Sequence, residues 1–284
     1  GCGGFAALSG SSVASALTMG KVALSEMDRY KYDVRLSTGV VAAGGTLGIL
    51  IPPSIPMIVY GFVTEESVIA LFLAGIGPGI ALIVLFVVFS MVHARFWGGQ
   101  AMEPASGWEE RKRASLRALP SLALALLIIG GIYSGAFTPT EAGAIGFAAA
   151  LFITVFVLRS LSWKGFKEAV FHSMATTVAI LLIIAGAKIF GKAITLYRIP
   201  QDISMFISGA IDTPLIFILV ISAILLAMGL VFETLSMVLI MTPVLLPAAL
   251  AMGLDPIWFG IYMVVMVECA LITPPVGLNL YVIQ

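Results

Sequence analysis

The sequence twice places a double proline inside a long apolar run, as GGTLGILIPPS (residues 44–54) and as ALITPPVGLN (residues 270–279). Proline has no backbone N–H and its ring clashes with the preceding turn, so neither helix can continue through its double proline. Inside a membrane, an opened backbone is tolerated only where protein or a water-filled cavity covers it. Two broken membrane helices at corresponding positions point to the binding site of a transporter.

Composition places the chain among integral membrane proteins. Its mean hydropathy is +1.11, 60% of its residues are hydrophobic and only 11% are charged. Because basic and acidic residues are equal in number, nucleic acid is not an expected partner. The two cysteines, Cys2 and Cys269, suit neither a disulfide framework nor a metal site. The chain begins at Gly1 and stops at Gln284 within an apolar run, so we expect a fragment of a longer protein.

Apolar runs predict a series of membrane segments. The expected segments are 36–61 with the first break, 67–92, 118–134, 141–158, 169–195, 214–231, 235–251, and a last span after Asp255-Pro256 with the second break. Between 195 and 214 we expect a loop around Pro200, Asp202 and Asp212. Thr138 or Thr140 is the expected N-cap of the segment that starts at Glu141.

The distribution of positive charge predicts the orientation of these segments. Three links hold twelve of the fifteen Lys and Arg residues: four in 21–35, five in 93–117 and three in 159–168. Two crossings separate each link from the next, so all three lie on the same side of the membrane. The positive-inside rule makes that side cytoplasmic.

The two breaks belong to an internal repeat. The sequence offset that separates Pro52 from Pro274 also pairs Ser12 with Thr234. Each double proline therefore has a small polar cluster at the same distance upstream. Between the cluster and the break, each copy has an apolar arm, a short turn and a second helix.

The repeats are predicted to be inverted. The turn in the first copy, 21–35, is cytoplasmic, whereas counting crossings places the turn in the second copy, 252–256, on the opposite side. Secondary transporters use this architecture for alternating access. We interpret 8–12 and 232–234 as the tips of two re-entrant helical hairpins. Each tip would meet the break of its own repeat, where hydroxyl and carbonyl oxygens can coordinate a cation.

Four motifs resemble the large membrane subunit of dicarboxylate-type TRAP (tripartite ATP-independent periplasmic) transporters. They are FAALSGSS (5–12), residues 44–54 followed by YG (60–61), GIYSGAFTPTEA (131–142) and TPPVGLN (273–279). The resemblance covers essentially the whole chain and lacks the N-terminal part of the family. It implies an all-α, inverted-repeat elevator with re-entrant hairpins and broken transmembrane helices. Transport-domain parts would be 1–61 and 213–284, and 62–212 would be mainly scaffold.

The same resemblance implies a function and its partners. The chain would be the multi-pass subunit of a Na⁺-coupled importer of small organic acids, such as C4-dicarboxylates or sialic acid, in a bacterial or archaeal cytoplasmic (inner) membrane. A periplasmic substrate-binding protein would deliver the substrate, and a small membrane subunit would support the scaffold. Na⁺ is the implied coupling ion, and neither another cofactor nor a transition-metal site is expected.

The resemblance also implies the site residues. The first Na⁺ site matches Ser9, Ser11, Ser12, Gly48, Ile51 and Pro53. The second Na⁺ site matches Gly229, Glu233, Thr234, Ala270, Thr273 and Pro275. The positions matched to substrate transport are Ser9, Ser54 and Glu233, and many members have Asp where this chain has Glu233.

Four ionisable residues lie within the apolar segments. An ionisable residue at membrane depth indicates a functional site, and Glu233 at a hairpin tip is the clearest case; its alternative role is a helix cap. For Glu268 we expect a partner among the basic residues. Lys188 and Lys192, four residues apart on one helix, are expected to face the scaffold interior or to reach toward the interface.

Three other functions compete with this interpretation. A Na⁺–dicarboxylate symporter that needs no binding protein would share the hairpins and the inverted repeats. An intramembrane serine hydrolase would need a base near Ser9 and Ser12, whereas His93 and His172 lie near the ends of cytoplasmic links. A channel would not need broken repeats with hairpins. We therefore predict a transporter and no enzymatic activity.

Overall fold

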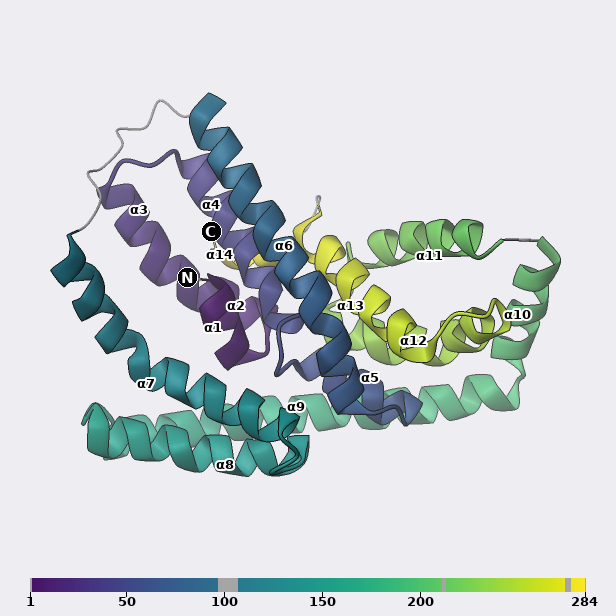
Figure 1. Cartoon of the computed structure of the whole chain (residues 1–284). Helices are drawn as coiled ribbons and strands as arrows, with labels where there is room; N and C mark the ends of the chain where they lie inside the picture. Colours follow the sequence, from purple (N-terminus) through teal and green to yellow (C-terminus); the bar gives the residue numbers. More distant parts are fainter. Residues whose placement is uncertain (1, 97–106, 211–212, 274–276, 284) are drawn as a thin grey trace. The chain divides into compact units, whose positions relative to one another are not determined.

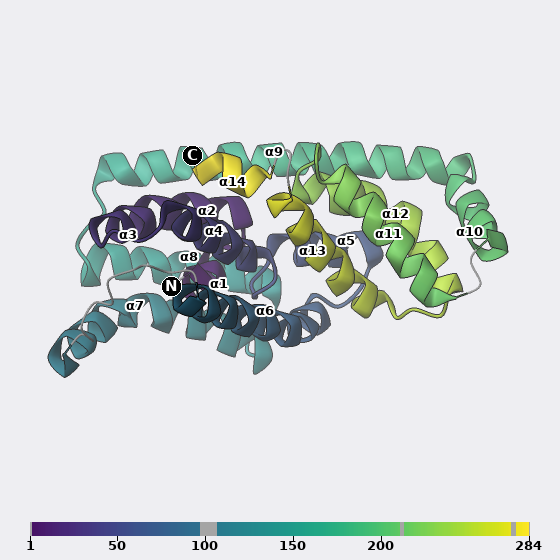
Figure 2. The same ribbon diagram turned by 90° about the horizontal axis from the view of Figure 1, so that it is seen from above.

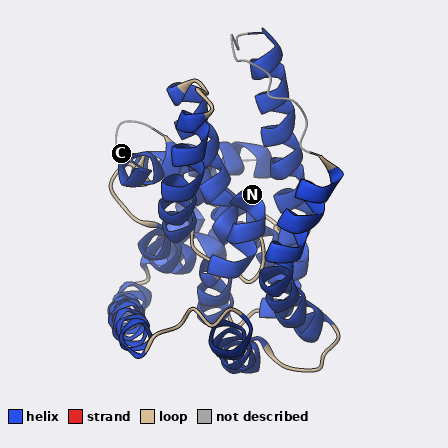
Figure 3. Cartoon of the chain, turned by 90° about the vertical axis from the view of Figure 1, so that its left-hand side faces the viewer, coloured by secondary structure: helices blue, strands red, loops and turns tan. Residues whose placement is uncertain are grey.

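The fold is helical, as the sequence predicts. The computed structural model describes residues 2–96, 107–210, 213–273 and 277–283, and within those ranges every regular element is a helix (Figure 3). Clustering of contacts divides the chain into two compact units. The first unit combines Gly1–Gln100 with Ile183–Gln284, and the second is Ala101–Leu182. The two predicted repeats both lie in the first unit.

The first repeat contains the predicted tip and the predicted break (Figure 1). Its helices are α1 (Cys2–Ser9), α2 (Ser12–Met19), η1 (Gly20–Leu24), α3 (Ser25–Arg29), α4 (Val34–Thr46), η2 (Leu47–Ile49) and α5 (Ile55–Thr64), and α6 (Val68–Phe96) follows. Helix α4 tightens into the 3₁₀ turn η2 and ends before Pro52. Helix α5 then starts anew, with the Ser54 hydroxyl as its N-cap and Pro56 in its first turn. The first predicted break is confirmed.

The second repeat has the same order of elements. Its helices are α11 (Pro214–Met228), α12 (Thr234–Ala251), α13 (Pro256–Ile272) and α14 (Leu278–Ile283), preceded by α10 (Ile199–Ala210). The predicted loop around Pro200 and Asp202 is wrong, because α10 occupies that segment; Asp212 lies outside the described residues. Pro200 stands in the first turn of α10, where the N–H that it lacks would have no helical partner. Asp202 lies in the same turn, where its negative charge interacts favourably with the positive end of the helix dipole.

Helix starts and caps repeat at the predicted offset. Ser11 caps α2, and its equivalent Glu233 caps α12. Asp33 caps α4 and Asp255, at the same offset, caps α13. Each of these side chains accepts a hydrogen bond from a backbone N–H three residues on. The repeat inferred from two pairs of prolines therefore extends to the helix boundaries.

The repeats are also packed reciprocally. The helix after the first break, α5, packs on α12 and α13 of the second repeat. The helix after the second break, α14, packs on α2 and α4, their counterparts in the first repeat (Figure 2). Such an exchange of equivalent contacts is what a pseudo-two-fold axis between the repeats would generate. The hairpin arms α11 and α12 each pack on α13, and α10 covers α12.

One contact fixes α5 against α13. The Tyr60 hydroxyl donates to the Pro256 carbonyl at 2.7 Å, and the Tyr60 side chain is completely buried. Its ring lies so close to Gly260 that a Cβ there would stand 2.5 Å from a ring carbon. Gly260 is therefore the residue that lets the two repeats approach at this point.

The second unit is a simple helical assembly. It contains α7 (Trp108–Tyr133), α8 (Pro139–Phe152), η3 (Ile153–Val157) and the first part of α9 (Trp163–Leu196). A capping box starts α8: the Glu141 side chain accepts from the Thr138 N–H at 2.8 Å, and the Thr138 hydroxyl accepts from the Glu141 N–H at 3.3 Å. Thr138, one of the two residues predicted, is thus the N-cap of α8, and Glu141 completes the capping box. Part of the polar link 93–117 is helical, because α7 already begins at Trp108.

Five of the described helices are long and apolar enough to cross a membrane: Val68–Phe96, Trp108–Tyr133, Pro139–Val157, Trp163–Leu196 and Thr234–Ala251. Four shorter apolar helices, Val34–Ile49, Ile55–Thr64, Pro214–Met228 and Pro256–Ile272, fall short of the roughly 20 residues that a span needs. All four lie in the two repeats. Short helices confined to the repeats are expected where re-entrant and broken segments occur.

The Gly260→Ala variant tests the packing between the repeats. We expect it to lose about 1–3 kcal/mol of unfolding free energy, because the new methyl group overpacks the contact with Tyr60. The measurement is thermal unfolding in detergent. Gly143→Ala is the matched control, since a Cβ at Gly143 in α8 meets nothing within 4 Å. Equal unfolding temperatures for the two variants would contradict the packing described here.

Candidate functional site

The first half-site is built where the tip between α1 and α2 meets the first break. The Ser9 and Ser15 hydroxyls lie 2.5 Å apart, and the Ser9 hydroxyl also donates to the Ser11 carbonyl at 3.1 Å. Ser12 is buried, with 2% of its surface exposed. Three hydroxyl side chains and the Ser11 carbonyl are thus concentrated in a short stretch of chain. Oxygen atoms at this density are the ligands that hard cations prefer.

Two glycines let the tip touch the broken helix. Gly10 has a φ of +61°, and a Cβ there would stand 2.7 Å from the Pro53 carbonyl oxygen. A Cβ at Gly48 would stand 2.7 Å from the Ser11 carbonyl oxygen and 2.8 Å from the Ser15 hydroxyl. Only glycine allows both approaches without displacing backbone. The predicted meeting of tip and break is present in the first repeat.

The break itself is held by side chains and by the tip. The Ser54 hydroxyl donates to the Ile49 carbonyl, which the interrupted helix leaves without a helical partner. The Ile55 N–H donates to the Gly10 carbonyl at 3.3 Å, and the Pro52–Pro53 peptide bond is cis. Ser54 is completely buried. The predicted substrate residue Ser54 therefore closes the break and starts α5; Ile51, beside it, is partly exposed.

The second half-site repeats this arrangement with different residues. Gly229 follows α11 and lies directly against Ala270 of α13, so that a Cβ at Gly229 would stand 2.0 Å from the Ala270 Cβ. Glu233 caps α12 by accepting from the Ser236 N–H at 3.1 Å, and Thr234 is 6% exposed. The Thr273 hydroxyl donates to the Cys269 carbonyl at 2.6 Å. Pro275 lies outside the described residues.

The two half-sites offer complementary electrostatics. In the first, the Ser11 carbonyl oxygen lies beside Gly48 of η2, and the amide ends of α2 and α5 start at Ser11 and Ser54. Carbonyl ends of helices favour cations, and amide ends favour anions. The second adds the Glu233 carboxylate, which is only partly buried. The arrangement can therefore hold a cation at each tip, with an anion nearby.

Ser15 belongs to the first half-site although the sequence analysis did not select it. Ser15 is completely buried and is the hydroxyl partner of Ser9. It lies one helical turn after Ser11, and the Ser15 N–H donates to the Ser11 carbonyl at 3.0 Å. The signal that could have identified it is the helical spacing of four residues, which puts both serines on one face of α2.

Glu268 does not have the basic partner that the sequence analysis expected. Its side chain is 3% exposed and faces the Thr46 hydroxyl and the Ile49 N–H, although neither contact has the geometry of a full hydrogen bond. No ion pair of the described residues includes Glu268. The expectation failed because the neighbouring segments of the first repeat are apolar or hydroxyl-bearing. The offset between the repeats pairs Thr46 with Glu268, so the facing side chains hold equivalent positions.

The surroundings of Ser9 do not suit a serine hydrolase. The hydrogen-bond partners of its hydroxyl are Ser15 and the Ser11 backbone, and neither can act as a general base. In the described part of the chain no cluster of His, Cys, Asp or Glu has the geometry of a metal site. Nucleophilic and metal-dependent hydrolysis thus find no support in this geometry.

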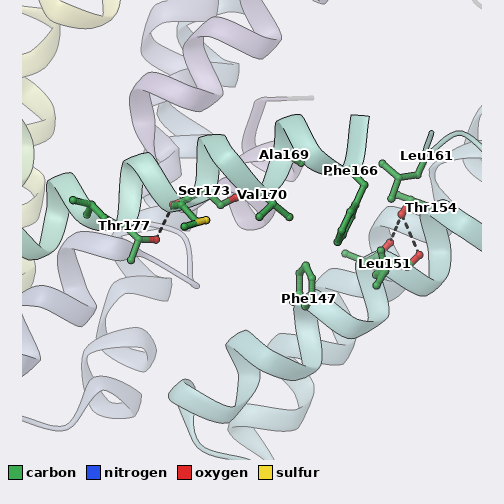
Figure 4. A pocket seen from close by; sticks show the side chains of 12 residues that line it. Phe147, Leu151, Thr154, Leu161, Phe166, Ala169, Val170, Ser173 and Thr177 are labelled. Atoms are coloured by element: carbon green, nitrogen blue, oxygen red, sulfur yellow. Dashed lines mark hydrogen bonds between the residues drawn. The ribbon is translucent and has the colours of Figure 1, made fainter. Parts of the chain in front are cut away.

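The second unit contains a separate, apolar cavity of about 590 Å³ between α8 and α9 (Figure 4). The Thr154 hydroxyl donates to the Ala150 carbonyl at 2.8 Å, and the Thr177 hydroxyl donates to the Ser173 carbonyl at 2.8 Å. Both hydroxyls are therefore used within their own helices. Without a charged side chain in its lining, this cavity is unsuited to binding an organic anion.

Comparison with known proteins identifies the family of the chain. The whole chain, residues 1–284, matches the family model described as "Tripartite ATP-independent periplasmic transporter, DctM component". A C4-dicarboxylate TRAP transporter large permease protein of Pseudomonas aeruginosa is 42% identical over 278 residues, which are 98% of this chain and 65% of that protein. A sialic acid TRAP transporter large permease protein of Vibrio cholerae is 36% identical over 99% of this chain and 65% of its own length.

A third relative is named for a different substrate. An isethionate TRAP transporter permease protein of Oleidesulfovibrio alaskensis is 35% identical over 99% of this chain and 44% of that protein. The chain thus spans about two thirds of the first two relatives and less of the third. All three are named as permeases and none as an enzyme, in agreement with the predicted absence of enzymatic activity. The chain belongs to the DctM family of tripartite ATP-independent periplasmic transporters.

Proposed function

We propose that this chain forms the transporting part of a Na⁺-coupled importer of small organic acids. The observation that carries the proposal is the close contact of each hairpin with the helix that breaks in its own repeat, at Gly48 against Ser11 and at Gly229 against Ala270 of α13. Both contacts bring hydroxyls, carbonyl oxygens and helix ends together inside an apolar protein. Ion-coupled transporters that work by alternating access place their substrate and ion sites at such broken helices in inverted repeats.

The substrate class follows from charge. The relatives are named for C4-dicarboxylates, sialic acid and isethionate, and each of these is an anion at neutral pH. A small organic anion needs amide or basic groups for recognition and a cation to offset the membrane potential. The Ser54-capped start of α5 supplies amides, and bound Na⁺ would supply the charge. We assign Ser9, Ser54 and Glu233 to substrate transport on this basis.

The proposed Na⁺ ligands are the residues that line each tip and break. For the first site they are Ser9, Ser11, Ser12, Gly48, Ile51 and Pro53, with Ser15 as a supporting hydroxyl. For the second site they are Gly229, Glu233, Thr234, Ala270, Thr273 and Pro275. Backbone carbonyls and hydroxyls suit Na⁺ because both are hard oxygen ligands. Bound Na⁺ would also join each tip to its own broken helix.

The proposed transporter works with other proteins. A periplasmic substrate-binding protein delivers the organic acid, a small membrane subunit supports the scaffold, and the complex lies in the inner membrane. The reciprocal contacts α5–α12 and α14–α2 support an elevator motion, because they join the two repeats into one body that can move together. The alternative is a Na⁺–dicarboxylate symporter that takes its substrate directly from solution.

Removing a hydroxyl from either tip tests the Na⁺ sites. Ser12→Ala and Thr234→Ala should each raise the Na⁺ concentration for half-maximal uptake by about tenfold, as expected when about 1.4 kcal/mol of ion binding is lost. Both side chains are buried at the tips that they belong to. The measurement is Na⁺-dependent uptake into proteoliposomes.

The matched control is Thr154→Ala. The Thr154 hydroxyl bonds within its own helix and lies outside both proposed sites, so its removal should leave Na⁺ dependence unaltered. If both tip variants kept the Na⁺ activation of the unmodified transporter, the Na⁺ sites would have to be reassigned.

Uptake with and without the binding protein separates the two transporter classes. The TRAP assignment predicts that transport of succinate, sialic acid or isethionate is lost when the cognate binding protein is omitted, because no protein then delivers the substrate to the membrane subunits. Proteoliposomes with the complete membrane complex provide the measurement. Equal uptake of the free anion would instead identify a binding-protein-independent symporter.

A further inference from the structure

Two lysines stand side by side on a membrane helix without an acidic partner. Lys188 and Lys192 are four residues apart on α9, and both are exposed. Neither belongs to an ion pair of the described residues. A cationic side chain at membrane depth is costly, and it indicates a function when no structural counter-charge accounts for it.

Both lysines line one cavity in the first unit. The cavity measures about 260 Å³ and is lined by residues of α5, α9 and α12, with Val63, Thr195 and Pro243 among them. The Lys188 ammonium also lies 4.5 Å from the centre of the Phe62 ring. A Cβ on Gly191, between the lysines, would meet nothing within 4 Å, so the wall is open there. No carboxylate of the described residues lines this cavity.

A second cavity continues the first toward the second half-site. It measures about 270 Å³, shares Ala187 and Leu239 with the first, and is lined by Ser236 at its other end. The Ser236 hydroxyl and N–H both bond to the Glu233 carboxylate, at 3.3 and 3.1 Å. The groove formed by these two cavities, here called the α9–α12 groove, leads from the lysines to the acidic hairpin tip.

On the orientation predicted from the distribution of positive charge, the groove runs from the extracytoplasmic side toward the middle of the membrane. The second cavity is lined by Ile183 of α9 and Ser236 of α12, and the first cavity by the later residues Thr195 of α9 and Pro243 of α12. The two helices therefore run in roughly the same direction along the groove. Helix α9 begins in the basic cytoplasmic link, and α12 begins at the hairpin tip. The ends of both helices that carry the lysines and Pro243 therefore point away from the cytoplasm.

We propose that the α9–α12 groove is the entry path of the organic anion and that Lys188 and Lys192 bind its carboxylate or sulfonate group there. The inference rests on the proposed function, and it adds a positively charged site that the two hairpin tips do not supply. Two ammonium groups one helical turn apart complement a carboxylate on an otherwise apolar path. The anion then has a continuous route to Glu233 and its bound cation.

The test replaces both charges. We expect Lys188→Gln combined with Lys192→Gln to raise the KM for the transported anion by about tenfold or more, because charge-assisted hydrogen bonds to the anion are lost. Uptake of succinate, sialic acid and isethionate is measured with the complete complex in proteoliposomes, and binding of the transported anion alone is measured by calorimetry. Lys188→Arg combined with Lys192→Arg should restore most of the affinity.

The control pair is Lys164→Gln combined with Lys167→Gln, whose lysines lie in the first two turns of α9. Unaltered KM and anion binding in the Lys188 and Lys192 variant would overturn the proposal. So would unaltered anion binding with a raised requirement for binding protein, since the lysines would then contact that protein. No uptake of any of the three anions by the unmodified complex would count against the proposed function itself.

Discussion

The structure depends on how the backbone is covered where a helix breaks at a double proline. A double proline frees the carbonyls of the preceding turn, and each unsatisfied group inside a bilayer costs several kcal/mol. In the first repeat the covering comes from a hairpin tip that approaches so closely that only glycine fits at Gly48. In the second repeat Gly229, at the end of α11, lies equally close to Ala270 of α13. Because a tip must fit against each break, the lengths of the arms, the positions of the caps and the choice of glycine are fixed together.

The same constraint relates the two repeats to each other. A helix that restarts after a break is too short to be stable alone, and α5 and α14 solve this by packing on the opposite repeat. Thr46 and Glu268 face each other from equivalent positions, which places them close to the pseudo-two-fold axis. The tip of one repeat and the restarted helix of the other thus share one core. Displacement of either half-site would have to carry the other with it.

Local chemistry explains which parts of the fold the sequence reveals. The breaks at Pro52 and Pro53, the cap at Glu141 and the repeat offset all depend on residues that act within one or two turns. Helix α10 was missed because Pro200 and Asp202 suit a loop as well as a helix start. Its packing on α12 decides between them, and that contact joins segments far apart in the sequence.

The functional site, like the fold, is only partly visible in the sequence. Hydroxyl-rich tips and an acidic tip are visible in the sequence, and the resemblance connects them with Na⁺. The roles of Ser15 and of the lysines are not visible in this way. The hydroxyl of Ser15 matters because it meets Ser9, and Lys188 matters because of its position over Phe62 and beside α12. These are relations between side chains on different turns or elements, which periodicity alone does not fix.

The two half-sites differ in charge, and this difference suggests an order of binding. An organic anion that has passed the lysines meets Glu233, whose carboxylate repels it; two unit charges about 4 Å apart interact by about 4 kcal/mol at an effective dielectric constant of about 20. A Na⁺ ion bound beside Glu233 removes that repulsion and turns the acidic tip into a neutral one. The first half-site holds only hydroxyls and carbonyls and imposes no such condition. Under the proposed Na⁺ coupling, ion binding at the second tip would therefore precede anion binding, and the acid at that tip would make transport of the anion depend on Na⁺.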